Sequence, residues 1–181
     1  MKLSSLTALS PVDGRYGSKT AELRPFVSEY GLIHHRLMVE IEWLKALAVH
    51  PLITEVPALS EDAIDYLNSI KVDFNEADAQ HVKDIESKIN HDVKAIEYFI
   101  KQKLEELDEL KAISEFVHFA CTSEDINNLS HALMLKGSRE QILLPEMDRL
   151  IATISDLAID YAAIPMLART HGQPASPTTV G

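Results

Sequence analysis

Three short segments of this 181-residue sequence gather side chains that could hold an anion or transfer a proton. The segments are Asn90-His91-Asp92, residues 122–128 and residues 170–175. The first two are expected to enter helices, where free backbone N–H groups favour an anion. His91 could add charge at the first, and the hydroxyls of Thr122 and Ser123 could hold a carboxylate at the second. Plain helix capping is the favoured interpretation for the first segment, and it is about even with anion binding for the second.

The third segment places His171 between Thr170 and the turn residues Gly172-Gln173-Pro174. Such a loop restricts the histidine, and an imidazole that titrates near neutrality suits general acid–base catalysis. An ordinary loop histidine is the alternative. None of the eight histidines occurs in a His-Glu-x-x-His pattern, and the sequence has no Gly-x-Gly-x-x-Gly or Walker loop. We therefore expect no metal site and no classical dinucleotide or P-loop site.

The composition is that of a globular protein, with 46% apolar and 25% charged residues. The 17 Lys and Arg against 28 Asp and Glu give a net charge of −11, which disfavours nucleic acid as a partner but not an anionic small molecule. The single cysteine, Cys121, excludes an intramolecular disulfide and fits a cytoplasmic protein. No apolar run approaches the roughly 18 residues of a membrane helix, so no membrane partner is expected.

Helices are expected to position these segments, because the chain has only six glycines and little β-type alternation. An irregular arm is expected over residues 1–24, and a long helix follows from about Pro25 to Pro51. The apolar stripe of this helix consists of Ile33, Leu37, Ile41, Leu44 and Ala48.

Shorter helices follow, and each is expected to begin after a capping residue: Ser60, Asn75 and Asn90. A short helix is expected over residues 110–120, and long helices from Ser123 onward. One of these long helices, over about residues 138–162, has an apolar stripe with too few partners in this chain to cover it.

The fold class is therefore expected to be all-α. A small helical domain occupies residues 1–112, and residues 113–181 begin a long-helix bundle. Residues 163–175 are expected to be irregular and to lead into a helix start, with Ser176 as cap and Pro177 at the first helical position. Because the sequence ends at Gly181, we expect a chain truncated at a helix start.

The segment Thr122-Ser123-Glu124-Asp125-Ile126-Asn127, followed further along by Thr170-His171-Gly172-Gln173-Pro174-Ala175, resembles the first two signature regions of the fumarase/aspartase superfamily. The resemblance covers essentially the whole chain. It is greatest to the branch that acts on succinylated purine nucleotides, because that branch shares three further segments: residues 10–16, 90–98 and 116–123.

The resemblance implies a β-elimination. Fumarate would leave adenylosuccinate to give AMP, and would also leave the succinylated aminoimidazole carboxamide ribotide. A base removes a proton from the succinyl Cβ, and an acid protonates the departing nitrogen. The family needs no metal and no organic cofactor, and its active sites are assembled from the subunits of a homotetramer.

Carried over position by position, the resemblance assigns eight residues. His171 is the general acid, and Thr122 and Ser123 hydrogen-bond a carboxylate of the succinyl group. The substrate's nucleotide part is contacted by Arg15 and Tyr16, and the same site is lined by Asn90, His91 and Asp92.

One signature of the superfamily, Gly-Ser-Ser-x-Met-Pro-x-Lys-x-Asn, is absent from this sequence. It carries the serine that acts as the general base, so the resemblance implies an amino-terminal portion that is inactive alone. Argininosuccinate lyase or 3-carboxymuconate cycloisomerase activity is an alternative, which Arg15-Tyr16 and residues 90–92 speak against. An all-helical interaction module that uses the stripe after residue 138 is the alternative without chemistry.

Overall fold

The computed structural model describes Ser4 and residues 6–181, and the chain forms two compact units, Met1–Ser138 and Arg139–Gly181. The expected irregular arm over residues 1–24 lies partly outside the described residues, at positions 1–3 and 5. Its described part consists of turns and bends up to a short 3₁₀ helix, η1 (Ala21–Leu23). The domain boundary expected near residue 112 falls within the first unit. It stays a prediction.

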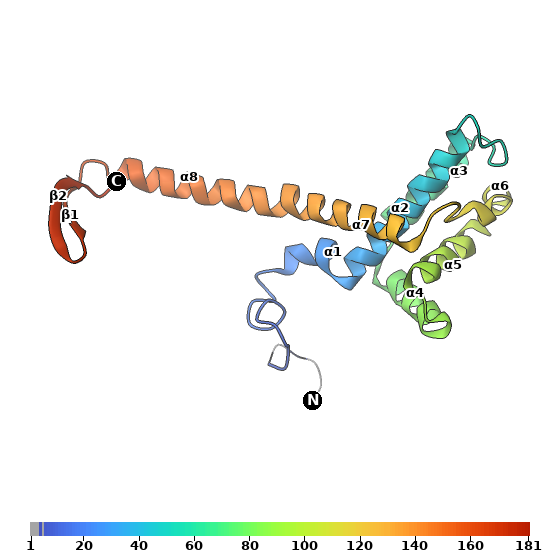
Figure 1. Cartoon of the computed structure of the whole chain (residues 1–181), viewed down its shortest axis with the longest axis horizontal. Coiled ribbons are helices and arrows are strands. Elements are labelled where there is room, and N and C mark those ends of the chain that lie inside the picture. Colours follow the sequence, from blue (N-terminus) through green and yellow to red (C-terminus); the bar gives the residue numbers. More distant parts are fainter. Residues whose placement is uncertain (1–3, 5) are drawn as a thin grey trace. The chain divides into compact units, whose positions relative to one another are not determined.

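Helix α2 (Glu29–Val49) is the central element of the first unit (Figure 1). The long helix expected from Pro25 is wrong at its start, because α1 (Arg24–Val27) ends at Ser28. Ser28 has an extended backbone, and its hydroxyl accepts a hydrogen bond from the N–H of Gly31 at 3.2 Å, so it caps a new helix. The predicted stripe is confirmed, since all five of its side chains are buried: Ile33, Leu37, Ile41, Leu44 and Ala48.

Three helices pack their apolar side chains with α2 into one core: α3 (Glu61–Val72), α4 (Glu76–Ile89) and α5 (Asp92–Leu104). The predicted caps Ser60 and Asn75 are confirmed, because each side chain accepts a hydrogen bond from the first turn of its helix. The helix expected over residues 110–120 is wrong. Two short turns stand there, α6 (Asp108–Lys111) and η2 (Ser114–Phe116), ahead of α7 (Ser123–Ser138).

The predicted cap at Asn90 is also wrong. Asn90 has a φ of 57° and ends α4 in the left-handed conformation, which asparagine tolerates better than most residues. The cap of α5 is the next residue, His91, whose Nδ1 accepts a hydrogen bond from the N–H of Lys94 at 3.1 Å. Helices α4 and α5 therefore meet at consecutive residues, because Asn90 ends α4 and His91 caps α5.

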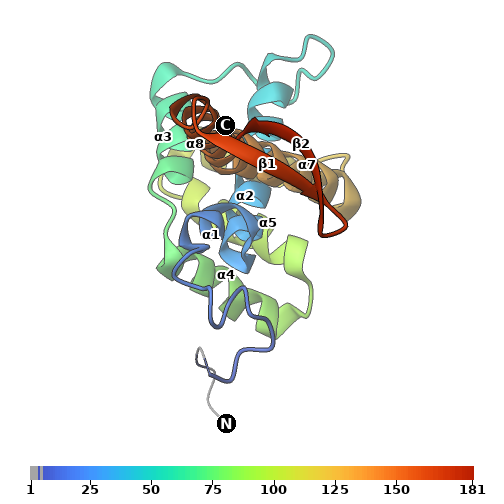
Figure 2. The ribbon, with the colours of Figure 1, turned by 90° about the vertical axis from the view of Figure 1, so that its left-hand side faces the viewer.

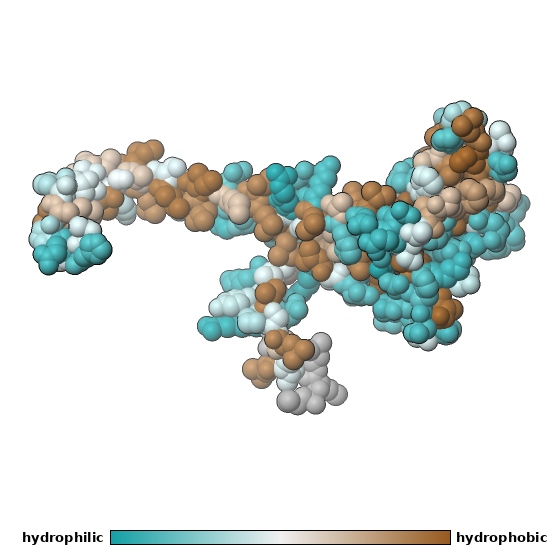
Figure 3. All heavy atoms as spheres, in the orientation of Figure 1, coloured by the Kyte–Doolittle hydropathy of each residue, from teal (hydrophilic) through white to brown (hydrophobic). Residues whose placement is uncertain are grey.

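The second unit begins with a π-helical turn, η3 (Arg139–Leu143), which leads into α8 (Leu144–Asp160). No residue of α8 is buried, and hydrophobic side chains lie along it (Figure 3). Its exposed apolar residues include Leu144, Met147, Leu150, Ile151, Ile154 and Leu157. Among the described residues, no helix has the length and apolar character that crossing a membrane requires.

The unit ends in an antiparallel hairpin of β1 (Pro165–Thr170) and β2 (Gln173–Thr179), seen as a two-stranded ribbon in Figure 2. The irregular stretch and the helix start expected at Ser176 are therefore wrong. Thr170 pairs with Gln173, so only His171 and Gly172 form the turn, and both have positive φ. That geometry matches the twist of paired strands. Prolines are tolerated in β2 because both strands of a two-stranded sheet are edges. Within the described residues this is the sole sheet, and the fold remains all-α.

Candidate functional site

Arg36, on α2, joins two of the three candidate segments. Its Nη2 donates a hydrogen bond to Oδ2 of Asp92 at 2.7 Å, and its Nε donates one to Oδ1 of Asn127 at 2.9 Å. The guanidinium is withdrawn from solvent, since only 6% of the side chain is exposed. A buried cation requires such partners, because an unpaired one is costly. The first residue of α5 and the fifth residue of α7 are therefore held to the same position on α2.

An apolar contact lies beside this polar one. Val39 is buried against Val93 and Ile126, and the partly buried Cys121 packs on the three. Val93 follows Asp92 in sequence, and Ile126 precedes Asn127. The same three helices are thus joined twice, once by the Arg36 hydrogen bonds and once by this small core.

Asp92 is anchored by these contacts. Its burial raises the pKa of the carboxyl, but the backbone N–H of Val93 and the Arg36 guanidinium outweigh burial, and the pKa lies below its ordinary value. Asp92 is therefore ionised near neutral pH, with Oδ2 engaged by Arg36. His91, one residue earlier, is about half exposed and caps α5 through Nδ1, which leaves Nε2 as its other polar atom.

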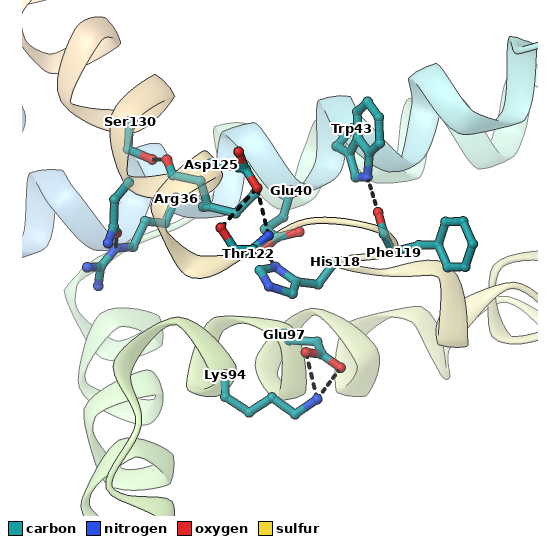
Figure 4. Close-up of polar contacts among 12 residues, drawn as sticks. Arg36, Glu40, Trp43, Lys94, Glu97, His118, Phe119, Thr122, Asp125 and Ser130 are labelled. Carbon is teal, nitrogen blue, oxygen red and sulfur yellow. Dashed lines mark hydrogen bonds and ion pairs between the residues drawn. The ribbon is translucent and has the colours of Figure 1, made fainter.

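At the start of α7, Thr122 is tied to Asp125 (Figure 4). The backbone N–H and the hydroxyl of Thr122 both donate to Oδ2 of Asp125, at 2.7 and 3.0 Å. These hydrogen bonds lower the pKa of Asp125. Asp125 therefore satisfies the N–H of Thr122, whereas capping of α7 by the hydroxyl of Thr122 or Ser123 stays a prediction. A ligand carboxylate at Thr122 would compete with Asp125. Ser123 begins the helix and is partly exposed.

A second polar contact with α2 holds the loop that precedes Thr122. Glu40, fully buried on α2, has Oε1 at 2.5 Å from Nδ1 of His118 (Figure 4). His118 lies four residues before Thr122 and has a φ of 63°, a left-handed conformation. Within the described residues, Oε2 of Glu40 has no hydrogen-bond partner. Burial raises the pKa of Glu40, and the carboxylate of Glu97 adds to the effect, while the His118 ring opposes it.

Arg36 and Glu40 belong to no motif, but their positions in the sequence carry a signal. Arg36 lies three residues after Ile33, and Glu40 lies three residues after Leu37, so both fall on the apolar face of the helix. Charged residues on a face of this kind must find buried partners. The partners themselves lie too far along the chain for spacing to identify them.

Arg15 and Tyr16 are paired with each other, and His171 lies in the other unit. The guanidinium of Arg15 stacks on the ring of Tyr16, 5.5 Å from its centre, within the arm. Among the described residues, no hydrogen bond or ion pair joins these two side chains to the segments at 90–92 and 122–123. His171 belongs to the second unit, where it is exposed at the hairpin turn with a φ of 49°.

Two other features bear on ligand chemistry. In the described part of the chain, no three His, Cys, Asp or Glu side chains are grouped so that they could hold a metal ion. A groove of about 680 Å³ lies between α2 and α7, and most of its lining is apolar, including Met38, Trp43, Leu129 and Leu133. A phosphate would find few partners in that groove.

A family model described as "Lyase" matches residues 14–181. Over all 181 residues the chain is 60% identical to adenylosuccinate lyase of Escherichia coli (strain K12) and 59% identical to adenylosuccinate lyase of Vibrio cholerae. It is 58% identical to adenylosuccinate lyase of Haemophilus influenzae. Each alignment covers 100% of this chain and 40% of the relative, so the chain spans about 40% of the length of these curated relatives.

Proposed function

This chain belongs to the lyase family whose model matches residues 14–181, and from that membership we propose that it forms the amino-terminal part of an adenylosuccinate lyase. The reaction is the β-elimination of fumarate from adenylosuccinate, which yields AMP, and from the succinylated aminoimidazole carboxamide ribotide. The observation that carries this proposal is the identity of about 60%, sustained over the whole chain, to enzymes of that name.

Each substrate is a polyanion with a phosphate at one end and two carboxylates at the other. The start of α7, with Thr122 and Ser123, receives a succinyl carboxylate through hydroxyl and backbone donors. His91 lies at the start of α5, and Arg36 holds that helix start next to α7. Arg15 and Tyr16 bind the nucleotide part.

The elimination requires a base and an acid. The base removes a proton from the succinyl Cβ, the carbanion is stabilised as an aci-carboxylate, and the carbon–nitrogen bond then breaks. His171 donates the proton that the departing nitrogen takes up. The hairpin turn supports this role because it exposes the imidazole and fixes its backbone. The general base is expected to lie in a segment that corresponds to the part of the curated relatives not aligned with these 181 residues.

Two measurements test this division of roles. The purified 181-residue chain is expected to release no fumarate from adenylosuccinate, and turnover by this chain would refute the requirement for a base from elsewhere. The protein at the full length of its relatives is expected to turn over adenylosuccinate. Faster elimination from argininosuccinate, or turnover of 3-carboxymuconate instead, would show that another reaction of the superfamily is its function.

We propose that the full-length protein is a cytoplasmic homotetramer, and the apolar side chains along α8 support its self-association. A helix with so many exposed leucine and isoleucine side chains is unfavourable in water and favours packing against other helices. We expect the protein at the length of its relatives to sediment as a tetramer, and replacing Leu150 and Ile154 by Ser to produce smaller species. A monomeric wild-type protein would contradict the assembly.

A further inference from the structure

We propose that Arg36 is a positioning residue that sets the placement of the two substrate-binding segments relative to one another, acting through Asp92 and Asn127. The proposal rests on the proposed function, since it concerns the same site. Arg36 itself has no assigned contact with the substrate, and its side chain is almost wholly buried.

The two segments come from distant parts of the chain. Arg36 is separated by 56 residues from Asp92 and by 91 residues from Asn127. Asp92 follows directly after the cap His91, and Asn127 is the fifth residue of α7, just beyond the turn in which Thr122 donates to Asp125. One planar guanidinium therefore contacts the beginnings of α5 and α7 through two different nitrogens. Its fixed geometry sets the orientation of the two helices as well as the distance between them.

The apolar contact of Val39, Val93 and Ile126 brings the same helices together but does not fix their register in the same way. Apolar contacts are non-directional, and small rotations of one helix cost little if the area stays buried. A displacement of about 1 Å at a site of this kind can cost on the order of 10²-fold in rate. The hydrogen bonds of Arg36 are the directional component of this junction.

Substitutions at Asn127 test the proposal without removing the buried charge. Asn127→Leu has a similar shape but no acceptor for Nε of Arg36, whereas Asn127→Asp keeps an acceptor oxygen at the same place. In the protein at the length of its relatives, we expect kcat/KM for adenylosuccinate to fall at least 10-fold in Asn127→Leu and to stay within 3-fold of wild type in Asn127→Asp. Arg36→Met, which removes both donors, is expected to lose at least as much as Asn127→Leu.

The matched control is Asn68→Leu. Oδ1 of Asn68, on α3, accepts a hydrogen bond from Nζ of Lys45 at 3.1 Å, so the substitution also removes an asparagine acceptor for a cation on α2. Lys45 is nine residues after Arg36, which places it about 13 Å further along α2 and on its opposite side. Lys45 keeps Glu42 as a partner, so we expect Asn68→Leu to lower the melting temperature less than Asn127→Leu while kcat/KM stays at the wild-type value.

The outcomes separate the two proposals. If the wild-type protein does not turn over adenylosuccinate, the proposed function fails. If the wild type is active and Asn127→Leu stays within 3-fold of it, or if Asn127→Asp loses as much as Asn127→Leu, the positioning role is overturned. An equal loss of kcat/KM in Asn68→Leu would also overturn it, because general destabilisation would then explain the effect. If Arg36→Met does not fold, the comparison of Asn127→Leu with Asn127→Asp still tests the positioning role of Arg36.

Discussion

Nδ1 of His118 lies 2.5 Å from Oε1 of Glu40, a carboxylate that has no exposed surface. The charges that face Glu40 come from two other elements: the His118 ring on the loop before α7, and Glu97 on α5. Glu97 is itself paired with Lys94 at 2.8 Å and with Lys101 at 3.2 Å. Burial dominates, so the pKa of Glu40 is raised above its ordinary value.

This raised pKa predicts how stability changes with pH. A carboxyl whose pKa is higher in the folded state binds its proton more tightly there, so its contribution to stability is greatest below the unfolded pKa of about 4.3 and is lost as pH rises through the folded pKa. Urea unfolding of this chain is expected to show the stability of the wild type declining, relative to Glu40→Gln, as pH rises above the unfolded pKa of about 4.3.

Glu42→Gln, on the same helix, is the control of opposite sign. Burial raises the pKa of Glu42, but Lys71 and Lys45 outweigh it, and the pKa is lowered. The wild type is therefore expected to gain stability relative to Glu42→Gln as pH rises through the acid range. A Glu40→Gln difference that grows with pH in the same direction would contradict the raised pKa of Glu40.

Asn90 combines a conformational role with an expected substrate contact, and two variants separate them. Asn90→Ala forces an alanine into the left-handed conformation, which is expected to cost about 1–2 kcal/mol of stability, whereas Asn90→Gly is expected to cost much less. Both variants lose the side-chain amide. In the protein at the length of its relatives, both are expected to raise KM for adenylosuccinate about 2- to 10-fold, as the loss of one hydrogen bond does. An unchanged KM in Asn90→Gly would show that the Asn90 side chain does not bind the substrate.

Local periodicity was enough to predict much of the helical core. The stripe of α2 repeats every three to four residues, and Ser60 and Asn75 are capping residues read from their immediate neighbours. The cap predicted at Asn90 is wrong because asparagine favours both ends of a helix, and here one helix ends where the next begins. The residues next to Asn90 do not show whether it ends α4 or caps α5.

The wrong prediction of a helix start at Ser176 also has a physical cause. Ser176-Pro177 has the chemistry of a helix start, but pairing of Pro165–Thr170 with Gln173–Thr179 takes its place, and pairing of this kind depends on residues outside the local window. The hydrogen bonds of Arg36 join residues that are 56 and 91 positions apart. The resemblance named residues on both sides of that junction but not the arginine between them.

Gly137 is predicted to be required for the contact of α7 with the ring of Phe26. A Cβ at position 137 would lie 2.5 Å from Cε1 of Phe26, closer than packed carbon atoms approach. Gly137→Ala is therefore expected to destabilise the chain by about 1–3 kcal/mol in urea unfolding, although alanine is the better helix former. Adding Phe26→Leu should relieve the clash, so the double variant is expected to lose less than the sum of the single losses. Strict additivity would contradict the contact.

The role of His171 as general acid is predicted to be visible in kcat. In the protein at the length of its relatives, His171→Ala is expected to lower kcat by about 10²–10⁴-fold, because the departing nitrogen then lacks a positioned proton donor. Alanine is also strained at the φ of 49° in the hairpin turn, so a loss in this variant alone could reflect a distorted loop.

His171→Asn resolves this ambiguity. Asparagine tolerates the left-handed conformation and is a preferred residue before glycine in a two-residue hairpin turn, so the β1–β2 pairing with Gly172 is expected to be preserved. It has no group that titrates near neutrality, and kcat should fall as far as in His171→Ala. Rates within 3-fold of wild type in His171→Asn would show that the turn conformation matters and that another group donates the proton.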